Sequence, residues 1–342
     1  MSLDVAGLVP YGWNPRVEAL LIDRLDDLTP ARVVRVTRTT CRVVTPAGEV
    51  VAVAPTLPAV GDWVGIDDAD PPVVTTVAEQ WSALTRMDPH GDRLQVLAAN
   101  VDLVLATCPA DRPSIERVER EMVLAWDAGA QPAVLVTKAD LGDAAELVAA
   151  LRDRLVGVDV LQTSAHDRAG VAEVATLLAP DRTAVVLGPS GAGKSTLINA
   201  LLGEERLATG AVREEDARGR HTTTTRDLVA IPSGGVVIDT PGLRSLGLGT
   251  DRDVGMANAF ADIAALAEGC RFRDCAHESE PGCAVREAVR TGELDPDRFA
   301  SYRKLAGELA YEERRVDPAA ARAQREQWKQ INKAMRRDRN KP

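Results

Sequence analysis

The sequence predicts a multidomain protein with a small N-terminal β-barrel, a central α/β domain and a mostly helical C-terminal domain. Three observations support this fold class. Short Val- and Thr-rich segments fill residues 31–85, apolar strands alternate with amphipathic helices from residue 101, and helical patterns follow residue 250. We expect five parts: an N-terminal extension at 1–30, the barrel at 31–90, the α/β domain at 91–250, the helical domain at 251–317 and a basic tail at 318–342.

Composition narrows the class of protein. The 342 residues are 45% apolar, which is typical of a globular chain and excludes disorder or a fibrous repeat for most of it. No apolar run is long enough to cross a bilayer, and the first residues do not have the pattern of a secretory signal. We therefore expect a cytoplasmic protein without a membrane partner. Cys41 and Cys108 lie in apolar stretches, as small core residues do.

Charge is unevenly distributed along the chain. The formal net charge is −10, yet residues 318–342 carry eight Lys or Arg and only two Asp or Glu. A basic tail on an acidic body suits a partner rich in phosphate, such as nucleic acid. The alternative is a solvated helix whose charges have no specific partner.

The barrel is predicted from five short segments that Gly and Pro separate. Five strands in so short a stretch favour a small barrel, and an OB-fold in particular. The edge of a sandwich is the alternative. The expected strands lie at 31–39, 40–48, 49–55, 61–67 and 72–79.

The central domain is predicted from a change of pattern after a connector at 86–100. Strands that alternate with amphipathic helices are typical of a doubly wound, mostly parallel sheet. The expected strands are 101–108, 132–137, 158–164, 184–188 and 236–240. The expected helices are 114–128, 143–156, 170–179 and one that begins at residue 194.

The strongest motif in the chain is a phosphate-binding loop at residues 188–195, which fits G-x-x-x-x-G-K-[ST] between a strand and a helix. Its glycines let backbone N–H groups point at phosphate oxygens, and the helix N-terminus adds a positive dipole end. Lys194 suits the β- and γ-phosphates, and the Ser195 hydroxyl suits Mg²⁺. The expected nucleotide contacts are Gly188, Pro189, Ser190, Gly191, Ala192, Gly193, Lys194, Ser195 and Thr196.

Two further segments fit a nucleotide site. Asp239-Thr-Pro-Gly242 follows an apolar strand, which suits a contact of Asp239 with Mg²⁺ and of the Gly242 backbone with the γ-phosphate. Residues 219–225, Gly-Arg-His-Thr-Thr-Thr-Thr, offer hydroxyls for a switch that depends on the γ-phosphate. A plain turn and a flexible Thr-rich loop are the respective alternatives.

A third segment bears on which base is bound. Thr137-Lys138-Ala-Asp140 ends a strand, and a carboxylate there can accept hydrogen bonds from the N1–H and N2–H₂ edge of guanine. Adenine lacks this pair of donors, so Asp140 would select GTP. Ser164 and Ala165 end the next strand and suit a turn beside the base.

The order of these segments is unusual. They resemble the five signature motifs of GTPases, but the base-reading segments at 137–140 and 164–165 precede the phosphate loop. A circular permutation accounts for this order, because the ends of compact domains often lie close together. The alternative is that 137–140 is coincidental and the protein is another P-loop enzyme, a kinase or an ATPase.

A cluster of metal-ligating residues lies in the helical part. Cys270, Cys275, His277 and Cys283 offer three thiolates and one imidazole within 14 residues. Zn²⁺ prefers four such ligands, and a Cys₃His set is a closed structural site. A redox or catalytic cysteine is the alternative.

Together these motifs closely resemble those of the RsgA (YjeQ) family of circularly permuted GTPases. The resemblance covers roughly residues 30–315 and includes GDWV at 61–64, QVLAANVD at 95–102, GRHTTTT at 219–225 and CRFRDCAHESEPGCAV at 270–285. It implies an OB-fold, a permuted GTPase domain and a zinc domain.

The resemblance also implies a function. It implies GTP hydrolysis to GDP and phosphate that the small ribosomal subunit stimulates, a role in late maturation of that subunit, and contacts of both flanking domains with its rRNA. It further implies that Lys138 and Asp140 read guanine, that Asp239 and Gly242 sense the γ-phosphate, and that the Cys₃His set binds one zinc. We expect a monomer that uses Mg²⁺ with GTP.

Two positions depart from expected patterns. Thr137 stands where the family usually has Asn, so we expect guanine selection to survive but some tethering of the loop to be lost. Leu243 stands where Ras-like enzymes carry a Gln that orients water, and an apolar side chain cannot polarise water. His221 is the candidate for orienting water, and it is the second expected catalytic residue in addition to Lys194. The alternative is that His221 contacts RNA or caps the loop.

A second function remains open at this point. The protein can be an RNA-binding assembly factor that uses GTP only as an affinity switch, because the same residues would serve both functions.

Overall fold

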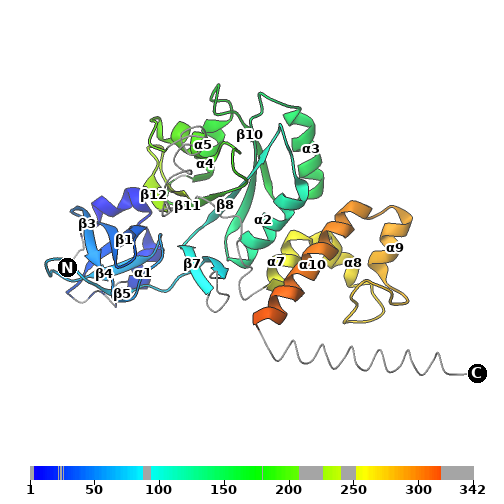
Figure 1. Ribbon diagram of the computed structural model, residues 1–342, viewed down its shortest axis with the longest axis horizontal. Coiled ribbons are helices and arrows are strands. Elements are labelled where there is room, and N and C mark those ends of the chain that lie inside the picture. Colours follow the sequence, from blue (N-terminus) through cyan, green and yellow to red (C-terminus); the bar gives the residue numbers. More distant parts are fainter. Residues whose placement is uncertain are drawn as a thin grey trace, which may run out of the picture. The chain divides into compact units, whose positions relative to one another are not determined.

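The computed structural model describes residues 4–21, 23, 25, 27–87, 94–178, 180–207, 226–239 and 252–316 (Figure 1). The chain divides into two compact units, one from residues 1–86 and 95–261, the other from residues 87–94 and 262–342. Among the described helices, none combines the length and the apolar character needed to cross a bilayer.

The first unit contains a five-stranded antiparallel sheet, here called the N-terminal sheet. Its strands pair in the order β3-β2-β1-β4-β5, and a parallel bridge between Val53 and Val73 joins its two edges. Apolar side chains that alternate along the strands, Cys41 among them, form the core of this sheet. The five predicted strands are confirmed, with the bounds Thr29–Val36 (β1), Thr40–Thr45 (β2), Gly48–Val53 (β3), Trp63–Ile66 (β4) and Val74–Val77 (β5).

Residues 4–21, which precede the N-terminal sheet, contain two short helices that the sequence did not indicate. A 3₁₀ helix (η1, Ala6–Tyr11) and an α-helix (α1, Pro15–Leu21) bury Leu8, Val17 and Leu21. Trp13, between them, packs edge-on against Trp63 with ring centroids 5.4 Å apart. The segment thus completes the apolar packing of the N-terminal sheet.

The first unit also contains a six-stranded central sheet. Its strands pair in the order β10-β9-β8-β11-β13-β12, and all except β12 are parallel. The predicted parallel sheet is confirmed, and β12 is an additional strand. The bounds are Leu103–Pro109 (β8), Gln131–Thr137 (β9), Asp159–Thr163 (β10), Thr183–Leu187 (β11), Asp227–Ala230 (β12) and Val236–Asp239 (β13).

Helices cover both faces of the central sheet (Figure 1). Helices α4 (Val171–Leu178) and α5 (Lys194–Leu202) share an apolar core with one face, and α2 (Ile115–Asp127) and α3 (Ala144–Arg154) contact the strands from the other side. Helix α7 (Arg252–Ala259) packs against α2. Cys108 is fully buried in β8, as expected.

The prediction of a connector at 86–100 is wrong. Strands β6 (Ala83–Met87) and β7 (Leu94–Ala99) pair as a separate two-stranded sheet. Both strands are short and have mixed composition, so no alternation of apolar and polar residues marked them.

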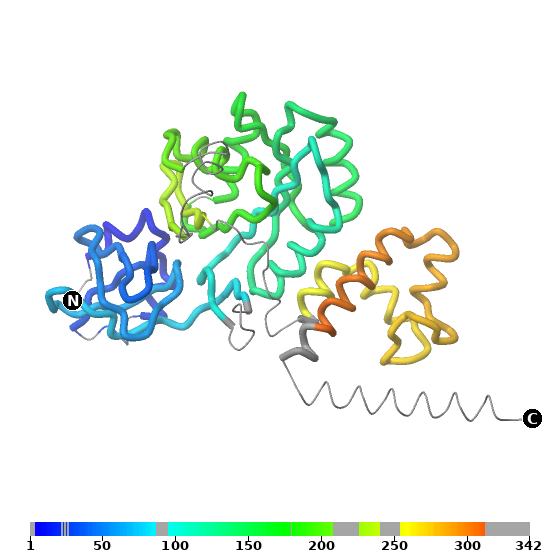
Figure 2. The backbone as a smooth tube through the Cα atoms, viewed as in Figure 1, coloured from blue at the N-terminus to red at the C-terminus, as the bar shows by residue number. Residues whose placement is uncertain are grey.

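The second unit is helical, as predicted, and Figure 2 follows its chain in yellow to orange. It contains α9 (Ala284–Thr291) and α10 (Pro296–Val316), and α8 (Ala261–Ala267) leads into it. Two nitrogens of the Arg298 guanidinium in α10 donate to the Asp262 carboxylate, Nη2 to Oδ1 at 2.9 Å and Nε to Oδ2 at 3.1 Å. This bidentate ion pair joins the start of α10 to α8.

Candidate functional site

The phosphate-binding loop joins β11 to α5, and its backbone explains its glycines. Gly188, Gly191 and Gly193 all have positive φ, at 140°, 73° and 84°. A Cβ at Gly188 would lie 1.9 Å from the Thr107 hydroxyl oxygen, so no side chain fits there. Helix α5 begins at Lys194, so its free N–H groups face the loop.

The ammonium of Lys194 lies over this loop. Its Nζ donates to the Gly188 and Pro189 carbonyl oxygens, at 2.9 Å each. Ser195 follows in the first turn of α5 and is largely buried. The loop therefore brings one cation and one hydroxyl to the carboxyl end of β11, where ligands of open α/β sheets bind.

The base-reading segment lies beside the phosphate loop. Thr137 is buried at the end of β9, and its hydroxyl donates to the Ala192 carbonyl at 2.8 Å. Thr137 therefore keeps one tether to the phosphate loop through this hydrogen bond. Lys138 has a positive φ of 55°, and its Nζ donates to Asp111 at 2.9 Å.

A cavity of about 300 Å³ joins the two segments. One wall of the cavity comes from the base-reading residues upstream, and the other comes from the phosphate loop and α5 downstream. Ser164, which precedes Ala165 in the chain, is buried. Sequence reasoning did not single out Leu141, Thr163, His166 and Leu197, although each is adjacent to a motif. The lining residues are Thr137, Lys138, Asp140, Leu141, Thr163, Ala165, His166, Gly193, Thr196 and Leu197.

The loop between β8 and α2 supports both segments, and no motif in the sequence marks this loop. Asp111 pairs with Lys138, and this hydrogen bond lowers the pKa of Asp111 below its ordinary value. The neighbouring Arg112 donates from Nη2 to the Ser190 carbonyl at 2.9 Å. This one loop therefore holds the base-reading lysine and the phosphate loop together.

A buried ion pair lies behind the phosphate loop. Arg117 donates to the Thr107 carbonyl and to Glu121, at 2.7 Å each. Burial raises the pKa of Glu121 to about 7, although Arg117 and Lys194 both favour its ionised form. Spacing on a helix alone could not distinguish this pair from an ordinary surface pair.

Asp239 ends β13 at the same edge of the sheet as the phosphate loop and is almost fully buried. In the antiparallel register it lies directly opposite Asp227 of β12. His221, Thr222 to Thr225 and Gly242 lie outside the residues that the structure describes.

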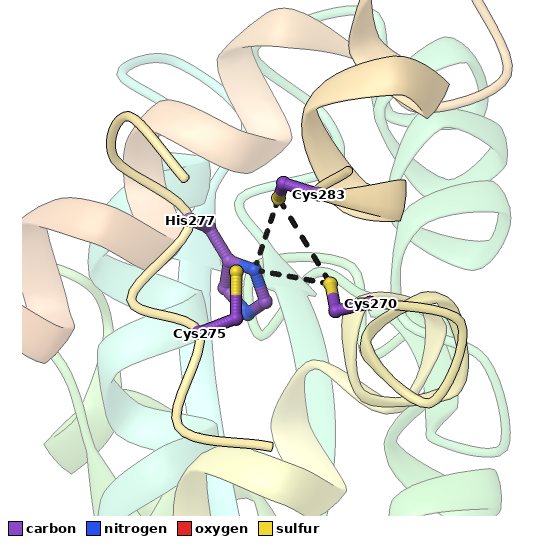
Figure 3. Close-up of side chains that lie close together, drawn as sticks. All are labelled: Cys270, Cys275, His277 and Cys283. Atoms are coloured by element: carbon purple, nitrogen blue, oxygen red, sulfur yellow. Dashed lines mark hydrogen bonds between the residues drawn. The ribbon is translucent and has the colours of Figure 1, made fainter. Parts of the chain in front are cut away.

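The second unit carries the Cys₃His cluster (Figure 3). The ligating atoms of Cys270, Cys275, His277 and Cys283 all lie within 4.8 Å of one another. His277 Nδ1 is 3.7 Å from Cys270 Sγ and 3.4 Å from Cys283 Sγ. Four such atoms converging on one point could hold a single metal ion.

The loop that carries these ligands is ordered by Glu280. Its carboxylate accepts from the backbone N–H groups of Ala276, Glu278 and Ser279 at 2.8 to 3.0 Å. Hydrogen bonds from backbone N–H groups, its own first, lower the pKa of Glu280 to about 2. His277 has a positive φ of 57°, which the same loop imposes.

Sequence comparison identifies relatives along most of the chain. The family described as RsgA GTPase matches residues 77–249. A Streptomyces avermitilis protein named "Small ribosomal subunit biogenesis GTPase RsgA" is 46% identical over 338 residues, covering 94% of this chain and 91% of the relative. An Opitutus terrae protein of the same name is 42% identical over 336 residues, covering 91% of this chain and 92% of the relative.

Two solved structures have the same fold. YjeQ from Thermotoga maritima aligns with a TM-score of 0.63 at 25% identity, covering 82% of this chain and 98% of YjeQ. YloQ, described as a circularly permuted GTPase, aligns with a TM-score of 0.61 at 24% identity, covering 84% of this chain and 96% of YloQ. The chain therefore belongs to the RsgA GTPase family, whose members hydrolyse GTP, and its central domain has the fold of a circularly permuted GTPase.

Proposed function

We propose that this protein hydrolyses GTP to GDP and phosphate on the small ribosomal subunit and assists the late maturation of that subunit. The names of its relatives support the ribosomal role. The observation that carries the GTP site is the cavity of about 300 Å³, which is lined by both Asp140 and the start of α5. Because base-reading and phosphate-holding residues border one cavity, a single nucleotide can span them.

Asp140 selects guanine in this proposal. Its carboxylate accepts hydrogen bonds from the N1–H and N2–H₂ groups of the base, and Ala165 turns the backbone beside it. Lys138 and Leu141 cover the base, while Thr137 fixes the segment to the phosphate loop through Ala192. Adenine would leave the carboxylate unpaired, which disfavours ATP.

Residues 188–196 hold the phosphates. Lys194 exchanges its two carbonyl partners for the β- and γ-phosphate oxygens, and its charge stabilises the transition state. The oxygens of Ser195 and Asp239 are the kind of donors that Mg²⁺ prefers. Asp239 ends β13, and Ser195 follows the loop after the adjacent parallel strand β11. They would hold the ion, which neutralises charge on the phosphates.

His221 is proposed to orient the attacking water, since Leu243 cannot. Gly242 is proposed to meet the γ-phosphate through its backbone N–H. An apolar Leu243 leaves the water poorly positioned in the free enzyme, so intrinsic turnover is slow and the bound subunit completes the site.

The Cys₃His cluster fits one structural zinc ion. Its three thiolates and one imidazole would supply the four ligands that structural zinc prefers, which would leave no position for substrate. The ion would hold a loop that has little apolar core of its own, so it stabilises the second unit.

The flanking parts are proposed to bind rRNA. The order β3-β2-β1-β4-β5 with a parallel bridge between β3 and β5 supports an OB-fold at 31–90. In this proposal the GTPase domain spans residues 91–250 and the zinc domain spans residues 251–317. Residues 318–342 are a basic tail that contacts RNA. The protein acts as a cytoplasmic monomer in this proposal.

Turnover of GTP with and without purified small subunits tests this function, with large subunits as the control. We expect slow intrinsic hydrolysis, a large stimulation by small subunits and none by large subunits. Fast intrinsic turnover that small subunits leave unchanged would contradict the proposal. If hydrolysis-deficient variants still supported maturation, GTP would act only as an affinity switch for an RNA-binding factor.

A further inference from the structure

An ion pair joins the N-terminal sheet to the central sheet next to Asp239. Arg35 of β1 contacts both carboxylate oxygens of Asp227 in β12: Nε donates to Oδ1, and Nη2 donates to Oδ2 at 2.6 Å. The side chains are 34% and 25% exposed, so the pair is partly withdrawn from water. Bidentate pairs of this geometry are stronger than ordinary surface ion pairs.

Asp227 lies beside the residue that we assign to the magnesium ion. Asp227 and Asp239 are direct partners in the antiparallel register of β12 and β13. Direct partners project to the same face of a sheet, with Cβ atoms about 4.5–5.5 Å apart, and like charges in such positions repel. Two carboxylates thus lie side by side at the nucleotide edge of the sheet, and Asp239 is almost fully buried.

We propose that Arg35 is a positioning residue of the nucleotide site, which neutralises Asp227 so that Asp239 alone presents a negative charge to the magnesium and phosphates of a bound nucleotide. This inference rests on the proposed function, because it takes Asp239 as the acidic residue of that site. It also means that the N-terminal sheet supplies a charge on which the GTP site of the central domain depends.

Other contacts fix the position of Arg35. Three residues earlier on β1, the fully buried Arg32 donates to the Thr183 hydroxyl at 2.9 Å, at the start of β11. Strand β1 therefore touches the central sheet at two points. The hydrogen bond to Asp227 raises the pKa of Arg35 above its ordinary value, so the guanidinium stays charged.

Removing Arg35 has two electrostatic consequences of opposite sign. An uncompensated Asp227 repels the phosphates, so the nucleotide binds more weakly when no metal is present. The same carboxylate attracts cations, so Mg²⁺ binds the nucleotide complex at lower concentration. A loss of structure would weaken both nucleotide binding and Mg²⁺ binding. Opposite changes in the two affinities therefore distinguish a charge effect from a merely structural role.

The test measures binding of a fluorescent GDP analogue to the full chain, first in EDTA and then during titration with Mg²⁺. We expect Arg35→Ala to raise the Kd in EDTA about three- to tenfold and to lower the Mg²⁺ midpoint by a similar factor. The double variant Arg35→Ala/Asp227→Asn removes the negative charge of Asp227 together with the cation that neutralises it. We therefore expect its Kd in EDTA and its Mg²⁺ midpoint to return close to those of the wild type.

Arg290→Ala is the matched control. It breaks the exposed ion pair of Arg290 with Glu287 in the second unit, so both values stay those of the wild type. If the double variant bound GDP as weakly as Arg35→Ala, or if Arg35→Ala left both values unchanged, the inference would be wrong. If the wild-type protein bound no GDP, the proposed function itself would fail.

Discussion

Thr137 ends β9, and its hydroxyl donates to the Ala192 carbonyl at 2.8 Å. The side chain type was visible in the sequence, but its partner was not, because that partner lies 55 residues downstream. The same limit applies to Glu121, whose burial and whose neighbour Lys194 depend on the packing of α2 behind the phosphate loop. Motif residues were predictable; the residues that hold them in place were not.

Thr137→Val should weaken nucleotide binding without unfolding the protein. Valine has nearly the same shape but leaves the Ala192 carbonyl without its donor, which costs about 1 to 3 kcal/mol. We expect the Kd for GDP to rise about tenfold. Thr176→Val is the control, since its exposed hydroxyl donates to the Glu173 carbonyl within its own helix α4. Equal affinities for the two variants would contradict the tethering role.

Glu121→Gln should change how stability depends on pH. Burial raises the pKa of Glu121 to about 7 from 4.5, so the folded state binds a proton more tightly than the unfolded state. The stabilisation is complete below pH 4.5 and is lost as the pH rises to about 7. Over this range we expect the wild type to lose up to about 3 kcal/mol of unfolding free energy that the variant does not lose.

Urea unfolding at several pH values measures this difference, and Glu173→Gln on the exposed face of α4 is the control. Parallel pH profiles for wild type and Glu121→Gln would show that Glu121 titrates normally.

At the scale of secondary-structure elements, the sequence pattern identified the helices and strands that are long and have regularly spaced apolar residues. The five parallel strands and the helices α2 to α5 were predictable because their apolar residues recur with the period of each element. Strand β12 has four residues and lies at an edge. Helices η1 and α1 flank Trp13, which packs on Trp63 of β4. Their structure depends on contacts that are distant in sequence.

Two helical glycines differ in the space around them, so we expect their replacement by Ala to change the unfolding free energy in opposite directions. A Cβ at Gly255 in α7 would lie 2.7 Å from the Val123 carbonyl oxygen of α2, whereas Gly307 in α10 has open space. Gly255→Ala should lower the unfolding free energy by about 1 to 3 kcal/mol, because the two helices must move apart. Gly307→Ala should raise it by up to about 1 kcal/mol through helix propensity.

Urea unfolding of the two variants measures both changes. A Gly255→Ala protein as stable as the wild type would mean that α7 does not pack closely on α2.

At the scale of the whole first unit, the junction between its two sheets depends on a buried cation. Arg32 is 1% exposed, stacks over Trp63 at 4.6 Å, and donates to the Tyr11 carbonyl at 2.8 Å. Burial lowers its pKa to about 10, while Asp102 and Asp62 oppose that shift. The order of the motifs predicted a permuted domain, but no pattern in the sequence indicated this junction, since an isolated Arg in a strand usually faces solvent.

Arg32→Ala should destabilise the first unit by about 3 to 5 kcal/mol, because it leaves buried acidic groups without their cation and the N-terminal segment without its anchor. Arg42→Ala is the control: its ion pair with Glu49 is 45% and 39% exposed, so its loss costs less than about 1 kcal/mol. Urea unfolding distinguishes the two. Equal effects would mean that the sheets are held together by apolar contacts alone.

The central claim is that chain upstream of the phosphate loop reads the base. The most direct measurement is the affinity of Asp140→Asn for GTP and for xanthosine triphosphate, whose base carries a carbonyl in place of the N2 amino group. An amide at residue 140 complements that carbonyl, so we predict that GTP binding weakens at least about a hundredfold and that xanthosine triphosphate becomes the preferred nucleotide. Unchanged GTP affinity with no gain for xanthosine triphosphate would contradict the account.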